Sequence, residues 1–235
     1  MKRGITCLMV IGLTTLQTAS FCQESLPVHN KKALLFSDDF TDTAISKNWI
    51  VEVAEAERKA CAVKDGQLEL NTLGGVTAWY KKELSGNVLI EFDRTVVMEG
   101  GANDRLSDLN QFWMATDPRQ KMLFSRKGDF KEYDSLQLYY VGMGGNYNTT
   151  TRMRRYDGHG KLEIVGEWKD SGHLLQPNKT YHISILAKDG VSSFYVDGKR
   201  FFSYRDEHPF TQGWFGIRST KSRQRIGRVR IWRIE

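Results

Sequence analysis

The segment Thr151–Tyr156 places cationic and phenolic side chains at alternate positions of a predicted strand. On an extended backbone Arg152, Arg154 and Tyr156 share one face. Paired guanidinium groups can bind a carboxylate or a sulfate bidentately, and a phenol ring can stack on a sugar face. These side chains, which Arg218 of a later strand could extend, predict a surface for an anionic glycan. The alternative is a solvated basic strand on the convex surface.

Cleavage of a polysaccharide by β-elimination needs a group that neutralises a uronate carboxylate and groups that move two protons. Arg, Asn and Gln can do the first, and Tyr or His the second. The segment Tyr140–Asn148 is loosely similar to the Tyr-Phe-Lys-Ala-Gly-x-Tyr-x-Gln strand of jelly-roll alginate lyases, although Val141 replaces the lysine. This resemblance would make Tyr147 the catalytic acid/base. We expect Arg152 and the amide of Asn110 to complete the catalytic set.

The remaining candidates are amides and aromatic rings near these segments. Apolar faces of sugars lie on aromatic rings, so Trp113 and Tyr139 are predicted to be stacking platforms, and amides could bind hydroxyl groups. The predicted substrate-binding set is Trp113, Gln111, Tyr139, Asn146, Asn148, Arg154, Tyr156 and Arg218.

Hydrolysis of a glycosidic bond would instead need two carboxylates at a fixed separation. Glu91 and Asp93 come nearest to the Glu-x-Asp-x-x-Glu arrangement of laminarinase-like sandwiches, but Val96 occupies the third acidic position. We therefore expect both acids to lie on a solvent face. A hydrolase could still take its acids from the loops, where the candidates are Asp104, Asp108, Asp117 and Asp134. A non-catalytic carbohydrate-binding module could use the same Arg and aromatic residues.

The elements that must position these residues are predicted to be about fourteen short strands. Turn signals such as Lys188–Gly190 and Asp197–Lys199 separate them, and no stretch has a convincing helical period. The predicted fold class is all-β, a two-sheet antiparallel β-sandwich with jelly-roll connections. Two long polar connections, 99–109 and 116–135, flank the segment 110–114. Long connections often carry function, so we expect them to form the walls of a cleft.

Motifs at both ends of the predicted domain resemble those of concanavalin-like domains that act on glycans. They are Leu35–Phe40, Trp49, Tyr195–Lys199 and Gly213–Ser219. Together they look like the YesU-like proteins and related uncharacterised families of bacterial polysaccharide-utilisation systems. The resemblance implies a concanavalin-like jelly roll and a polysaccharide partner, but such motifs specify fold better than activity. It also implies that Asp38 and Asp39 could hold a structural calcium; no other cofactor or metal site is predicted.

The N-terminus predicts export. Residues 1–22 have the positive start, apolar run and small residues of a signal peptide, and they are followed by a spacer (23–33) and the sandwich domain (34–235). We expect a periplasmic or secreted protein, with lipid anchoring at Cys22 as the alternative. The net charge of +6 indicates an acidic partner. Because of export, that partner is expected to be a glycan and not a nucleic acid, and no membrane span is predicted.

Overall fold

The structure is a computed structural model that describes residues 25, 31–107, 109–120 and 122–235. The predicted leader (1–22) and most of the predicted spacer lie outside the described residues, as does Asp108. Within the described part of the chain, no helix is long and apolar enough to cross a membrane.

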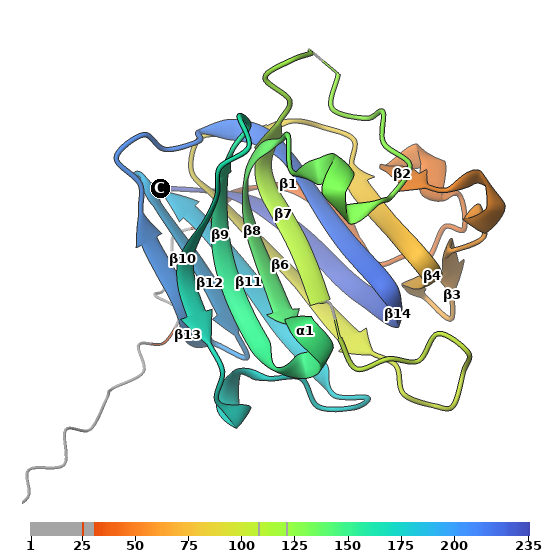
Figure 1. The fold of residues 1–235 in the computed structure, drawn as a ribbon. Coiled ribbons are helices and arrows are strands. Elements are labelled where there is room, and N and C mark those ends of the chain that lie inside the picture. Colours follow the sequence, from red (N-terminus) through yellow and green to blue (C-terminus); the bar gives the residue numbers. More distant parts are fainter. Residues whose placement is uncertain (1–24, 26–30, 108, 121) are drawn as a thin grey trace, which may run out of the picture.

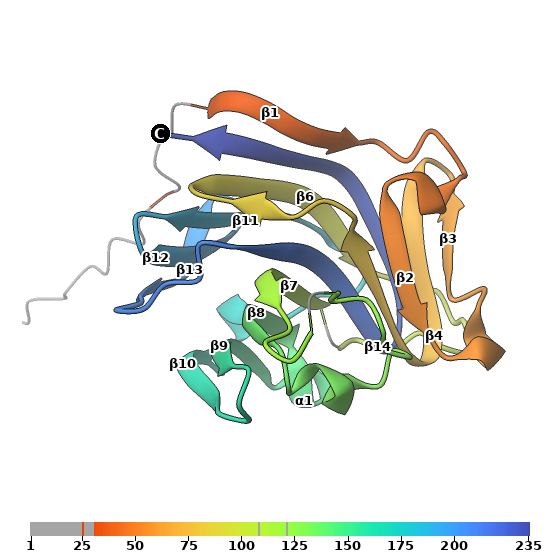
Figure 2. The same cartoon turned by 90° about the horizontal axis from the view of Figure 1, so that it is seen from above.

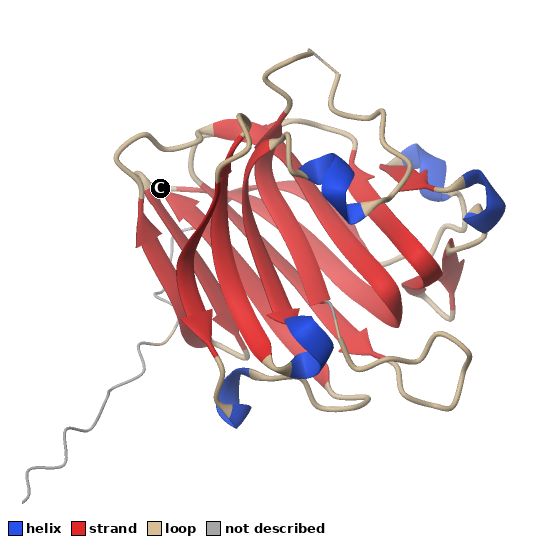
Figure 3. Cartoon of the chain, in the orientation of Figure 1, coloured by secondary structure: helices blue, strands red, loops and turns tan. Residues whose placement is uncertain are grey.

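Strands make up most of the described chain, and they form two layers that face each other (Figure 1, Figure 2). In chain order they are β1 (Lys31–Asp38), β2 (Trp49–Val53), β3 (Cys61–Lys64), β4 (Gln67–Tyr80), β5 (Leu84–Ser85), β6 (Val88–Val96), β7 (Leu109–Thr116), β8 (Gln137–Gly144), β9 (Thr150–Asp157), β10 (Leu162–Trp168), β11 (Thr180–Lys188), β12 (Val191–Val196), β13 (Lys199–Arg205) and β14 (Gln212–Ile234). Figure 3 shows that the helical turns lie in the connections between strands. They are η1 (Ile45–Lys47), η2 (Glu55–Glu57), η3 (Phe130–Tyr133), α1 (Gly145–Asn148) and η4 (Ser171–His173).

The front sheet, nearest the viewer in Figure 1, has the strand order β10-β9-β8-β7-β14-β4-β2. The back sheet contains β13-β12-β11-β6-β14, with β1 on the far side of β14. The two long strands β4 and β14 pass from one layer to the other. Because every pairing is antiparallel, the predicted all-β antiparallel sandwich is confirmed.

The main core lies between the two sheets. Ile90 and Phe92 of β6 and Phe215 and Ile217 of β14 are fully buried there, and the rings of Phe92 and Phe215 lie 5.7 Å apart. Alternate residues of each strand point inward, as period-two alternation requires. Burial of each such side chain contributes about 1.5–3 kcal/mol, which makes this core the main source of stability.

Both predicted tight hairpins are confirmed. Asp189 and Gly190 connect β11 to β12, and Asp197 and Gly198 connect β12 to β13. All four residues have positive φ, between 47° and 78°. Two consecutive residues with positive φ match the twist of an antiparallel pair, which explains the Asp-Gly sequence at both turns.

The two long connections differ in where they lie. Arg105, in the first one, donates hydrogen bonds to the carbonyls of Thr220 and Lys221, so this connection packs against the bend of β14. The second connection, residues 117–136, folds over the outer face of the front sheet, and we call it the front loop (Figure 1). The front loop decides which part of that face a ligand can reach.

Candidate functional site

On the outer face of the front sheet, paired residues of four neighbouring strands form a row, and three of the four are polar. Arg152 pairs with Gly142, Gly142 with Asn110, and Asn110 with Arg218. Residues paired across antiparallel strands point to the same face. Arg154 and Tyr156 follow Arg152 on that face, so the structure brings together five residues of the predicted set. They are Asn110, Arg152, Arg154, Tyr156 and Arg218.

Tyr140 lies in the middle of this face and was not in the predicted set. Its hydroxyl donates a hydrogen bond to Oδ1 of Asn110 at 2.9 Å, and the guanidinium of Arg154 lies 5.5 Å from the centre of its ring. A Cβ at Gly142 would lie 2.2 Å from the hydroxyl, so glycine leaves the space that it fills. Tyr140 alternates with Gly142 along β8 and lies opposite Arg154 of β9. This pattern is the sequence signal that could have identified Tyr140 as a site residue.

The front loop buries the part of this face that lies over β7, β14 and β4. Leu123, Phe130 and Tyr133 of the loop pack on Trp79 and Phe112, and these residues form a second apolar cluster outside the main core. The ring of Phe112 lies 5.5 Å from that of Tyr133. The predicted site residue Arg218 is therefore buried beneath the loop, where it donates a hydrogen bond to the carbonyl of Gly128 at 2.8 Å.

A buried carboxylate fixes the front loop in place. Glu52 of β2 accepts hydrogen bonds from the backbone N–H groups of Ser125 and Arg126, at 2.9 and 2.8 Å. Its other oxygen accepts from Trp79 Nε1 at 2.7 Å and from the Tyr133 hydroxyl at 2.9 Å. Burial, together with the charge of Glu52, raises the pKa of Tyr133 well above its usual range. Four donors satisfy this carboxylate, so its role is to hold the loop.

Among the described residues of this face, those along β9 and β10 are the open ones. Across one row of paired residues the exposed fraction falls from 50% at Ile164 of β10 to 6% at Tyr140 and 0% at Phe112. We call the open part the shelf. Its side chains are Arg152, Arg154, Leu162, Ile164 and Glu167. Arg152 is ion-paired with Glu167, whereas Arg154 forms no ion pair with the described residues.

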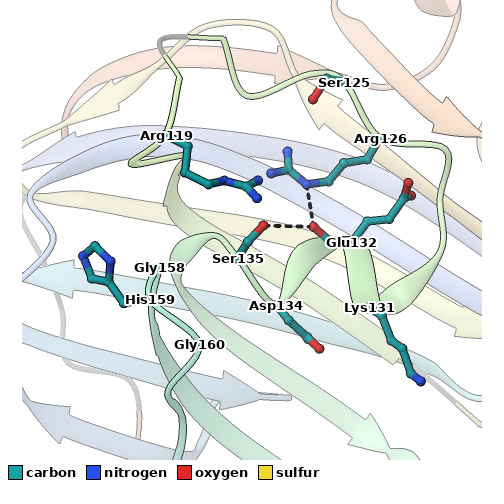
Figure 4. Close-up of a pocket in the computed structure, with 10 residues that line it drawn as sticks. All are labelled: Arg119, Ser125, Arg126, Lys131, Glu132, Asp134, Ser135, Gly158, His159 and Gly160. Atoms are coloured by element: carbon teal, nitrogen blue, oxygen red, sulfur yellow. Dashed lines mark hydrogen bonds between the residues drawn. The ribbon is translucent and has the colours of Figure 1, made fainter.

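A cavity of about 660 Å³ lies between the front loop and the turn after β9 (Figure 4). It is lined by Arg119, Ser125, Arg126, Lys131, Glu132, Asp134, Ser135, Gly158, His159 and Gly160. Burial raises the pKa of Asp134, although the nearby charges of Arg154 and Lys131 act in the opposite direction. Asp134 forms no ion pair with the described residues. Its carboxyl group is therefore available to a ligand and holds its proton to higher pH than an exposed aspartate.

The other acids from the sequence have structural roles. Asp117 accepts hydrogen bonds from Arg119 and Arg126, and Asp104 accepts two from Arg223. Although burial alone would raise the pKa of Asp117, these partners hold it well below its usual range.

The two acids of β6 lie far from the shelf, on the outer face of the back sheet. Glu91 is ion-paired with Lys31, and Asp93 is ion-paired with Arg228 and hydrogen-bonded to His182.

The turn after β8 holds three further predicted residues, Asn146, Tyr147 and Asn148. All three have positive φ, from 52° to 60°. Asn148 exchanges two hydrogen bonds with the backbone of Leu175, which fixes the turn. Tyr147 is 81% exposed, and the guanidinium of Arg105 lies 5.5 Å from its ring centre. Because β8 starts near the cavity and ends at this turn, the structure separates Tyr147 from the cavity by the length of the strand (Figure 1).

Three predicted residues point into the core instead. Trp113 donates a hydrogen bond to Ser192 at 2.7 Å, and Tyr139 donates one to Asp206 at 2.6 Å. Gln111 donates to the carbonyl of Val141. All three are buried between the sheets, which corrects the expectation that Trp113 and Tyr139 stack on a sugar and that Gln111 reaches one. The reason is that side chains alternate between the two faces along β7 and β8, and these three residues occupy inward-facing positions.

The described side chains contain no group of three or more His, Cys, Asp and Glu residues placed to hold a metal ion. The structural calcium stays a prediction. Asp38, which the resemblance offered as a calcium ligand, accepts hydrogen bonds from Trp49 Nε1 at 2.9 Å and from Asn48 at 3.3 Å. Its carboxylate thereby ties the end of β1 to the start of β2.

The fold and the site define a concanavalin-like sandwich with a partly covered front face. A family model described as a domain of unknown function, DUF6250, matches residues 70–229, and the chain belongs to this family. The YesU-like assignment remains a prediction. A search of curated proteins found no match.

Solved structures share the fold. A protein of unknown function with a galectin-like fold from Bacillus subtilis matches with a TM-score of 0.73 and 15% identity, over 88% of this chain and 99% of that chain. The carbohydrate-binding module CBM66 from B. subtilis matches with a TM-score of 0.56 and 14% identity, over 79% and 96%. An endo-β-1,3-glucanase from Pyrococcus furiosus matches with a TM-score of 0.60 and 11% identity, over 86% and 94%. Such low identities establish a common fold only.

Proposed function

We propose that this protein acts on an anionic polysaccharide or oligosaccharide outside the cytoplasm and binds it along the shelf. The observation that carries the proposal is Arg154, a partly exposed guanidinium that has no ion pair among the described residues. Leu162 and Ile164 expose apolar surface beside it, which suits the face of a sugar ring. The carbohydrate-binding module and the glucanase among the fold neighbours support a carbohydrate ligand.

We favour β-elimination as the reaction. On the shelf the one carboxylate, Glu167, is ion-paired with Arg152 and Lys169, so the shelf offers no pair of accessible acids for hydrolysis. At the open end of the shelf, Tyr147 presents a phenol to solvent beside Arg105. A phenol and a guanidinium can move a proton and neutralise a uronate carboxylate.

The test is incubation of the exported protein with polygalacturonate, alginate and hyaluronate. A lyase produces unsaturated ends, which are followed by their ultraviolet absorbance. Tyr147→Phe should lower the rate of cleavage at least a hundredfold, in line with the loss of a general acid/base. Tyr204→Phe on β13 is the matched control. Full activity in Tyr147→Phe would remove this tyrosine from the mechanism.

Hydrolysis is the second candidate, and Asp134 is the observation that favours it. Its raised pKa is the property expected of a general acid. New reducing ends without unsaturated products, lost in Asp134→Asn, would establish hydrolysis. Retention on an immobilised glycan with no products would leave a binding module. In the same expression experiment, the mass of the exported protein tests cleavage of the leader and lipidation at Cys22.

A further inference from the structure

The front loop closes one long side of the shelf. The exposed fraction of side chains falls to zero within three strands, and neighbouring strands lie only about 4.8 Å apart. Tyr140 and Phe112 lie under the loop or against it, next to Phe130 and Tyr133. A glycan would therefore lie along β9 and β10 and not across the sheet.

The shelf is also closed at its cavity end. The turn Gly158–Gly160 reaches the front loop, and a Cβ at Gly158 would lie 2.7 Å from Cγ of Pro118. Gly158 also has a φ of 80°, which residues with side chains rarely adopt. At the opposite end of the strands, Tyr147 stands exposed. The shelf is thus open toward α1 and ends at the cavity.

The cavity is large enough for a sugar residue, and its lining is polar. Its volume of about 660 Å³ falls in the range of small-molecule sites. Asp134 and Lys131 lie on one side of the lining, and Arg119 and His159 lie on the other (Figure 4). Asp134 has no ion pair among the described residues, so it can accept hydrogen bonds from hydroxyl groups.

We infer that the shelf and the cavity together bind the end of an anionic glycan chain, with the terminal sugar in the cavity and the following sugars along β9. This inference rests on the proposed function and adds the mode of recognition. A terminal sugar carries a free hydroxyl at the position where an internal sugar is linked to its neighbour. Asp134 is placed to bind that hydroxyl, and a degrading enzyme with this site releases its products from chain ends.

The number of chain ends can be varied at constant sugar mass, which gives a direct test. Polygalacturonate, alginate and hyaluronate are each immobilised intact and after partial acid hydrolysis to shorter chains of known mean length. The amount of wild-type protein bound at saturation is then measured. Recognition of chain ends predicts that bound protein rises in proportion to the number of ends.

The outcomes separate the two proposals. Equal binding per gram of intact and shortened polymer would overturn recognition of the chain end but retain a glycan-binding shelf. No binding to any of the three glycans would overturn the proposed function and, with it, this inference.

A substitution of Asp134 tests whether the terminal sugar lies in the cavity. Asp134→Asn should weaken binding to the shortened chains about tenfold or more, the usual loss for a hydrogen bond to a charged group. Asp65→Asn, in an exposed turn, is the matched control, and thermal unfolding verifies that both variants fold. Unchanged binding by a folded Asp134→Asn would remove the terminal sugar from the cavity.

Discussion

Two arginines on the same face of β9 differ in how available their charges are. Arg152 is ion-paired with Glu167, which also holds Lys169 at 2.8 Å. Arg154 lies over the ring of Tyr140 and has no ion pair with the described residues. A guanidinium that is already paired must lose its partner before it binds a ligand, and this costs free energy. Of the two arginines, Arg154 is therefore the one whose charge is more available to an anionic glycan.

This difference predicts unequal effects of two matched substitutions. Arg154→Ala should weaken binding of an anionic glycan about tenfold or more, because it removes a charge-assisted hydrogen bond. Arg152→Ala removes a guanidinium that is already neutralised and should have a smaller effect. Titration calorimetry with the glycan that binds best gives both affinities. Equal losses in the two variants would contradict the assignment.

The thiol of Cys61 provides a second prediction at the scale of the residue. Burial in the core raises its pKa to about 12, so almost none of it is thiolate at neutral pH. Because the thiolate is the reactive form, Cys61 should resist iodoacetamide in the folded protein and react fully in denaturant. Peptide mass spectrometry measures the labelling. Rapid modification of Cys61 in native buffer would show that the strand opens locally.

The presence of the strands could be predicted better than the direction of their side chains. The sequence predicted strands at β7 and β8, but both faces of these strands are buried: one by the back sheet and one by the front loop. Hydrophobicity then no longer distinguishes inside from outside, and a shift of one residue exchanges the faces. Trp113 and Tyr139 consequently point inward, while the neighbouring Tyr140 points outward. In β9 the outward-facing residues could be identified from the sequence, because the outer face of this strand is polar.

The front loop is seated by a close contact between two backbone segments. A Cβ at Gly128 would lie 2.2 Å from the carbonyl oxygen of Gly75, and Gly128 has a φ of 87°. Gly128→Ala should therefore destabilise the protein by about 2 kcal/mol or more, from strain and overpacking together. Gly100→Ala is the control, since Gly100 has a φ of 86° with open space around it. Denaturant unfolding compares the two; equal losses would mean that the contact adds nothing to the strain.

The first long connection is held by an ion pair that depends on pH. Burial alone would raise the pKa of Asp104, but hydrogen bonds from Arg223 and from the N–H groups of Gly101 and Glu99 lower it from 3.8 to about 2. A carboxyl whose pKa is lower in the folded state stabilises the protein above its unfolded pKa. This stabilisation, about 2 kcal/mol, is lost as the pH falls from about 4 to 2.

Asp104→Asn should therefore lower stability at neutral pH and flatten the fall in stability between pH 4 and 2. The free energy of unfolding, measured against pH, gives the slope for the variant, for the wild type and for the control Asp65→Asn. Parallel curves for wild type and Asp104→Asn would show that the pKa of Asp104 is not lowered by folding.

At the scale of the whole molecule, β14 joins the two sheets into one unit. Its first half pairs with β7 and β4 in the front sheet, and its second half pairs with β6 and β1 in the back sheet. The main cluster takes side chains from both sheets, so loss of either sheet would expose the core side chains of the other. A disturbance in the front half of β14 should therefore destabilise the back sheet as well.

Gly216→Ala tests this coupling. Gly216 lies in the front half of β14, where a Cβ would come within 2.4 Å of the buried ring of Trp79. The crowding should cost about 1–3 kcal/mol. If both sheets unfold together, the slowest amide hydrogens of β8 and of β11 exchange faster by the same factor in the variant. Gly198→Ala, at an open hairpin tip with a φ of 78°, is the control for backbone strain alone. Faster exchange confined to β8 would mean that the sheets open separately, and that the shelf could change shape without the back sheet.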